Sequence, residues 1–103
     1  MINTNSNKNG GLFTYTHFNN KVVGIVSLSC ETDFAAKTDV FKILGEHLAM
    51  QVACSDVETV DEFQKLECVF GDDSEGVIND SIGAISKKLK EKVEILKIQK
   101  IEF

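Results

Sequence analysis

The chain has 103 residues and a mass of 11.4 kDa, which is the size of one domain. Its 11 basic residues are all lysines, and its 16 acidic residues give a formal net charge of −5, a balance that argues against nucleic-acid binding. No apolar run approaches the roughly 20 residues that cross a bilayer, and three widely spaced cysteines favour reduced thiols and a cytoplasmic protein.

The N-terminal third predicts a tail followed by a β-hairpin. Residues 1–11 are rich in Asn, Ser and Gly and lack the layout of a secretory signal, so we expect a flexible tail there and a domain over 12–103. Leu12–Phe18 is rich in aromatic and β-branched residues, which predicts a strand. Asn19-Asn20 predicts a tight turn because asparagine tolerates positive φ. The nearly continuous apolar run Val22–Ser29 then predicts a second strand.

The middle of the chain predicts a helix after a short polar connection. Thr38 is the expected N-cap, and the helix should end near Cys54-Ser55. One apolar stripe follows the cap at spacings of three, four and four: Phe41, Leu44, Leu48 and Val52. Gly45 lowers helix propensity within this segment, and a close contact between helix and sheet would be a reason to keep it.

The C-terminal half predicts two further helices and a last strand. A short helix is expected within Asp56–Leu66 and a turn at Gly71–Ser74. A second amphipathic helix has apolar residues at spacings of four, three and four: Ile78, Ile82, Ile85 and Leu89. Val93–Phe103 is rich in β-branched residues and predicts a strand. The element order predicts an α+β fold, a three-stranded antiparallel sheet with helices packed on one face.

Side chains that often carry chemistry show no catalytic or metal-binding pattern. The histidines and cysteines lack metal-type spacing and offer no nucleophile turn or oxyanion loop: His17, Cys30, His47, Cys54 and Cys68. No Gly-rich phosphate loop is present in the sequence. The acidic residues Asp72, Asp73 and Glu75 lack the alternating ligands of a calcium loop. We therefore expect no catalytic residue, no metal and no cofactor, and a protein that is not an enzyme.

The segment Glu31–Ala36 places one aromatic residue in a polar connection. Two interpretations of Phe34 stay open from the pattern alone. The ring can fold back as a lid on the protein's own core. Alternatively, it can project as an anchor into a partner's pocket, with Asp33 making polar contacts beside it.

The segment Cys30–Lys37, leading to Phe41, resembles the hallmark segment of the elongation factor Ts family, the guanine-nucleotide exchange factors of elongation factor Tu. The similarity covers about residues 12–103, with a gap in the middle. Further similar stretches follow in the family's order: Tyr15–Lys21 with Val23 and Gly24, Leu66–Glu67, Phe70, Asp72–Ser74 and Ile85–Glu102.

This resemblance implies a core-like domain of the family that binds an elongation factor Tu-type GTPase and promotes GDP release. It implies that the aromatic ring enters a pocket beside the magnesium and phosphate site of the GTPase. The expected partner-binding residues are Thr32, Asp33, Phe34 and Ala35. Two alternatives stay open, a module that binds the GTPase without exchange and a homodimer formed through the sheet.

Departures from the family pattern predict a weak exchange factor. The family's N-terminal ubiquitin-associated-like module is expected to be missing, and its long middle segment is reduced to Asp56–Lys65. Ala35 stands where a larger aliphatic residue is usual, Asn20 replaces the hairpin glycine, and Lys97-Ile98 replaces a pair of arginines. Each change removes contact area or charge that would support binding.

Overall fold

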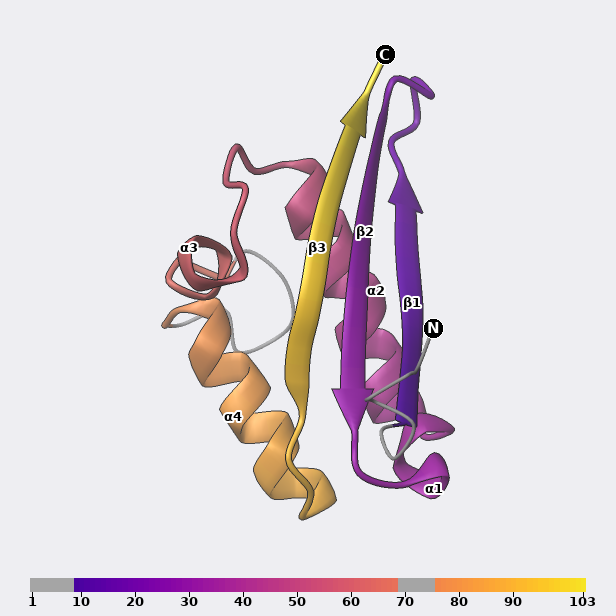
Figure 1. The fold of residues 1–103 in the computed structure, drawn as a ribbon, viewed down its shortest axis with the longest axis vertical. Coiled ribbons are helices and arrows are strands. Elements are labelled where there is room, and N and C mark those ends of the chain that lie inside the picture. The colour runs from indigo at the N-terminus through magenta and orange to yellow at the C-terminus, as the bar shows by residue number, and fades with distance from the viewer. Residues whose placement is uncertain (1–8, 69–75) are drawn as a thin grey trace, which may run out of the picture.

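The computed structural model describes residues 9–68 and 76–103, and these ranges contain three strands and four helices (Figure 1). The elements in chain order are β1 (Asn9–Thr16), β2 (Val22–Cys30), α1 (Asp33–Ala36), α2 (Asp39–Ala53), α3 (Val60–Gln64), α4 (Ile78–Leu89) and β3 (Glu94–Glu102). The strands form an antiparallel sheet in the order β1-β2-β3, and α2 crosses behind it in Figure 1. This confirms the predicted α+β class.

The predicted hairpin turn between β1 and β2 is confirmed. Asn20 has a φ of 60°, and the His17 N–H donates to the Val22 carbonyl at 2.9 Å. The bounds of β2 and β3 lie within one residue of those predicted. Periodicity and turn chemistry are local properties of the chain, so the sequence is enough to predict these elements.

The start of β1 differs from the prediction and corrects the expected tail. The strand begins at Asn9 rather than Leu12 and ends at Thr16 rather than Phe18, so residues 9–11 pair with β2. Gly10 has a φ of 140°, and a Cβ at this position would lie 2.0 Å from the Leu28 carbonyl oxygen. The Gly-rich composition of this segment suggested a tail, but a residue without a Cβ is required at position 10 because two backbones approach closely there.

The helices follow the predicted stripes. The Thr38 hydroxyl accepts the Phe41 N–H at 3.2 Å and caps α2, which ends at Ala53 as expected. The predicted segment 56–66 contains the five-residue α3, and α4 matches its stripe.

No helix in the described ranges is long and apolar enough to cross a bilayer. The predicted residues that lie outside the described ranges are 1–8, Phe70, the turn Gly71–Ser74, and the acidic residues Asp72, Asp73 and Glu75.

The core lies between the central strand β2 and the helices. The largest side chains that are fully buried come from four elements: Val26, Leu28, Phe41, Leu48, Phe63 and Ile78. Each contributes about 1.5–3 kcal/mol by leaving water. The ring of Phe13 on β1 meets that of Phe41 edge-on at a centroid distance of 5.8 Å. This core fixes α2 against the sheet, and α1 joins the end of β2 to the start of α2.

Gly45 makes the close contact between helix and sheet that would explain its presence. A Cβ there would lie 2.3 Å from the Phe13 ring, so we predict that Gly45→Ala lowers the free energy of unfolding by about 1–2 kcal/mol, since overpacking outweighs the gain in helix propensity. The control is Gly83→Ala on α4, where nothing lies within 4 Å of the added atom, and it should stabilise by about 1 kcal/mol. Denaturant unfolding measures both, and equal stabilisation by the two variants would contradict this packing.

Candidate functional site

The strongest candidate site is the turn from β2 into α1, at the opposite end of the sheet from the hairpin turn (Figure 1). Thr32 caps α1, because its hydroxyl oxygen accepts the Ala35 N–H at 3.1 Å. The Phe34 side chain in the first turn is 81% exposed. The alternative in which this ring folds back onto the core is therefore wrong. A large aromatic ring in water at a helix start is the kind of anchor that protein interfaces use.

The other predicted residues, Asp33 and Ala35, differ in how far they are exposed to solvent. Asp33 is exposed and pairs with Lys37 one turn later, at 2.9 Å between carboxylate and ammonium. This exposed pair is worth at most about 0.5 kcal/mol. Ala35, also named as a partner-binding residue, is 2% exposed and belongs to the core. The structure thus brings Asp33 and Phe34 together in solvent and places Ala35 beneath them.

A carboxylate far along the chain holds the turn in place. Glu91 Oε1 accepts the N–H groups of Glu31 and Thr32, each at 3.0 Å. Glu91 Oε2 accepts the Thr32 hydroxyl at 2.5 Å. The Glu31 carboxylate in turn accepts the Lys92 N–H at 2.5 Å. Two chain segments about 60 residues apart therefore exchange hydrogen bonds directly beside Phe34.

The backbone turn after α4 directs Glu91 to this position. Lys90 ends the helix with a left-handed φ of 59°, a conformation that is uncommon for a residue with a Cβ. The Glu91 N–H then donates back to the Ser86 carbonyl at 3.1 Å, which closes the helix end. Sequence reasoning missed Glu91 because the pattern presents it only as one acid among lysines.

These contacts change the protonation of two groups. The hydrogen bond from the Thr32 hydroxyl, together with the two backbone N–H groups, lowers the pKa of Glu91 below its ordinary value. Burial, followed by the charge of Glu91, raises the pKa of Cys30. The Cys30 thiol donates to the Thr32 carbonyl, at 3.3 Å between sulfur and oxygen. A protonated, hydrogen-bonded thiol packs as a structural group and is a poor nucleophile.

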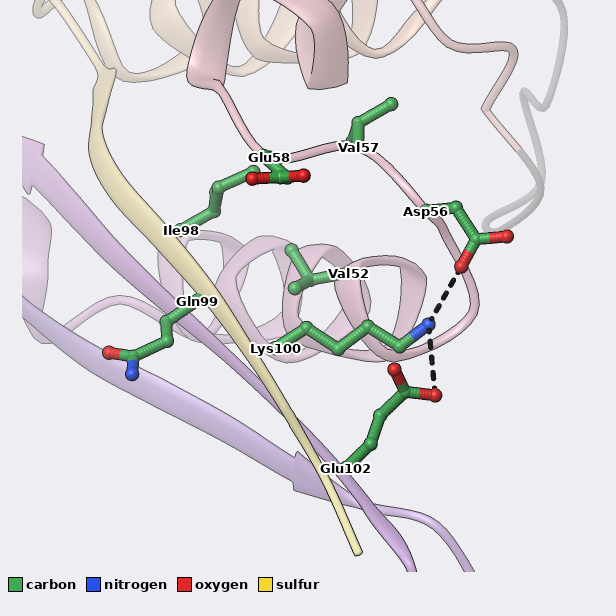
Figure 2. Close-up of a pocket in the computed structure, with 8 residues that line it drawn as sticks. All are labelled: Val52, Asp56, Val57, Glu58, Ile98, Gln99, Lys100 and Glu102. Atoms are coloured by element: carbon green, nitrogen blue, oxygen red, sulfur yellow. Dashed lines mark hydrogen bonds and ion pairs between the residues drawn. The ribbon is translucent and has the colours of Figure 1, made fainter.

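A hollow of about 440 Å³ lies between the end of α2, the connection to α3 and strand β3, away from this turn (Figure 2). Its lining combines apolar and charged side chains: Val52, Asp56, Val57, Glu58, Ile98, Gln99, Lys100 and Glu102. The Lys100 ammonium lies 2.8 Å from the Ser55 carbonyl and 3.2 Å from the Asp56 carboxylate. The Lys100 ammonium also lies 3.8 Å from the Glu102 carboxylate, so Lys100 pairs with two of the acidic side chains that line the hollow. No group of three or more metal-binding side chains occurs within the described parts of the chain.

The lowered pKa of Glu91 predicts how stability depends on pH. An ionised carboxylate favoured by the fold stabilises fully above its ordinary pKa of 4.5 and loses this contribution as the pH falls through the lower value in the folded state. Glu91→Gln should therefore be less stable than the wild type near neutral pH, and the difference should shrink below about pH 4.5. Denaturant unfolding at about pH 7 and about pH 3 measures this difference. A difference that stays constant across this range would contradict the assignment.

Comparison with known proteins places the site inside a matched region. The family model described as Elongation factor TS matches residues 31–103. The chain is 41% identical over 59 residues to the chloroplastic elongation factor Ts of Cyanidioschyzon merolae, a match that covers 56% of this chain and 28% of that protein. It is 54% identical over 46 residues to elongation factor Ts of Herpetosiphon aurantiacus, a match that covers 45% of this chain and 23% of that protein. It is 57% identical over 42 residues to elongation factor Ts of Maridesulfovibrio salexigens, which covers 41% of this chain and 20% of that protein. The chain thus spans about a quarter of the length of these relatives.

Proposed function

The chain belongs to the elongation factor Ts family, and from that premise we propose that it binds an elongation factor Tu-type GTPase through Phe34 and promotes the release of GDP. Members of this family are nucleotide exchange factors of translation elongation and are not enzymes. The single observation that carries the proposal is the Phe34 ring, which is 81% exposed on a turn held by four hydrogen bonds to Glu91 and Lys92. Three free cysteines, one of them exposed, suit a reducing cytoplasm.

The mechanism follows from linkage between two binding events. If insertion of the ring and tight binding of magnesium and GDP are incompatible, each weakens the other by the same factor. A coupling of about 4 kcal/mol corresponds to nearly a thousandfold change in affinity. Burying one phenylalanine supplies about 1.5–3 kcal/mol. Phe34 therefore provides a large part of the coupling, and polar contacts from Asp33 are needed to add to it.

The surroundings of Phe34 suit such an anchor. Thr32 and Ala35 hold the helix turn that carries the ring, since Thr32 caps the helix and Ala35 is buried in the core. A side chain already presented to solvent by an ordered turn loses less conformational entropy when it binds. The carboxylate of Asp33 is 70% exposed despite its pairing with Lys37, so it is accessible to a partner.

Removal of the Phe34 ring is the direct test of this proposal. We expect Phe34→Ala to weaken the acceleration of GDP release from purified elongation factor Tu by about 10- to 150-fold, which is the affinity equivalent of burying one phenylalanine. The control is Phe103→Ala, which removes a fully exposed ring at the chain end opposite α1 (Figure 1) and should leave the rate unchanged. Release of a fluorescent GDP analogue measures both variants. Equal rates for wild type and Phe34→Ala would reject the proposal.

A module that binds the GTPase without exchange is the alternative function. The observation that favours it is Ala35, a small side chain that is 2% exposed and therefore offers little apolar surface to a partner. Titration calorimetry with GDP-bound elongation factor Tu separates the two functions. Heat of binding without faster release supports the module, and absence of heat counts against both.

We also propose that two copies of the chain associate through the open face of the sheet. Leu12 and Leu96 are 73% and 39% exposed and line one shallow hollow of about 230 Å³. Apolar side chains gathered on a sheet face gain stability when a second face covers them. Sedimentation over a range of concentrations should show a dimer that Leu12→Lys weakens. A monomer at high concentration would reject this association.

A further inference from the structure

We propose that Glu91 is a positioning residue for the Phe34 ring: its carboxylate fixes the turn from β2 into α1 so that the ring projects in the direction a partner requires. This inference rests on the proposed function, because the direction of the ring matters only if a partner receives it. Glu91 does not touch the partner in this account. It acts through Thr32 and the backbone that carries Phe34.

The carboxylate of Glu91 uses both oxygen atoms on the same turn. Oε1 accepts two consecutive backbone N–H groups, from Glu31 and Thr32, and Oε2 accepts the Thr32 hydroxyl. The hydroxyl proton is therefore directed at Glu91, which leaves an oxygen lone pair to accept the Ala35 N–H at 3.1 Å. Glu91 thus selects the side-chain orientation in which Thr32 caps α1. Phe34 lies two residues after this cap.

The turn needs such support because α1 is too short to be stable alone. A helix of four residues forms one turn, and nucleation of an isolated turn is unfavourable. Two neighbouring contacts have neutral acceptors: the Cys30 thiol donates to the Thr32 carbonyl, and the Asn9 side chain donates to the Glu31 carbonyl at 3.1 Å. Hydrogen bonds to an ionised acceptor are about twice as strong as neutral ones. Glu91, with the Glu31 carboxylate that accepts the Lys92 N–H, therefore supplies most of the polar restraint on the start of α1.

The effect on partner binding follows from the fraction of molecules in which the Phe34 ring points in the direction that the partner requires. Without the carboxylate, Phe34 remains exposed but samples several directions. If the competent direction falls to about a tenth of the population, the apparent affinity for the partner falls about tenfold. The chemistry of the ring is unchanged, so the loss comes from positioning alone.

The first test measures order in the free protein and needs no partner. Backbone ¹⁵N order parameters of residues 31–36 should fall from about 0.85 to below about 0.6 in Glu91→Ala. Glu91→Gln keeps an oxygen acceptor for the two N–H groups and should give an intermediate value. The matched control is Glu58→Ala, which removes an exposed carboxylate from the connection after α2, away from α1 (Figure 1), and should change nothing. If neither Glu91 variant lowers the order parameters, the inference is overturned. Because Glu91→Gln keeps an acceptor for the Glu31 and Thr32 N–H groups, it is the variant to measure if Glu91→Ala fails to fold.

The second test asks whether Glu91 acts through Phe34. Glu91→Ala should slow stimulated GDP release about tenfold in the wild-type background and have no further effect in the Phe34→Ala background. An equal loss in both backgrounds would show a merely structural role and overturn the inference. If the wild type neither binds the GTPase nor accelerates release, the proposed function fails. The order parameters still decide whether Glu91 fixes the turn.

Discussion

The exchange of hydrogen bonds between residues 31–32 and 91–92 is the constraint on which the account depends. Glu91 accepts three of these bonds, and Glu31 accepts the fourth. An exposed aromatic ring on a free loop would lose much of its binding energy to conformational entropy when a partner fixed it. This contact joins the connection between β2 and α1 to the connection between α4 and β3, so α1 starts from a point that hydrogen bonds hold beside the sheet.

The core and the site meet within α1. Phe34 and Ala35 are adjacent in sequence, yet one is 81% exposed and the other 2%. Successive residues of a helix point about 100° apart, so burial of Ala35 directs Phe34 toward solvent. The hydrophobic core therefore fixes which face of α1 turns inward, and the Glu91 carboxylate fixes its end. Both contacts restrain the turn that carries the ring.

The sequence predicted those features that depend on neighbouring residues. The stripe of α2, its Thr38 cap and the turn at Asn20 follow from periodicity and side-chain chemistry within a few positions. The missed features depend on residues far apart in the chain. Gly10 is needed because the backbone of β2 lies against it. Glu91 contacts Thr32, which lies 59 positions earlier in the chain, and no pattern of residue spacing indicates such a contact. The pattern around Phe34 allowed both a buried and an exposed ring, because the choice depends on tertiary contacts such as the packing of Ala35.

The most direct measurement follows the side chain at position 34 itself. The chain contains no tryptophan, so Phe34→Trp labelled with fluorotryptophan gives one ¹⁹F resonance from this protein, and an unlabelled GTPase adds none. We predict a solvent-exposed resonance that shifts to a buried environment when elongation factor Tu is added. The resonance should return to its first position when magnesium and GDP are supplied in excess, since the two binding events are linked. A resonance that stays solvent-exposed while the two proteins form a complex would contradict the account.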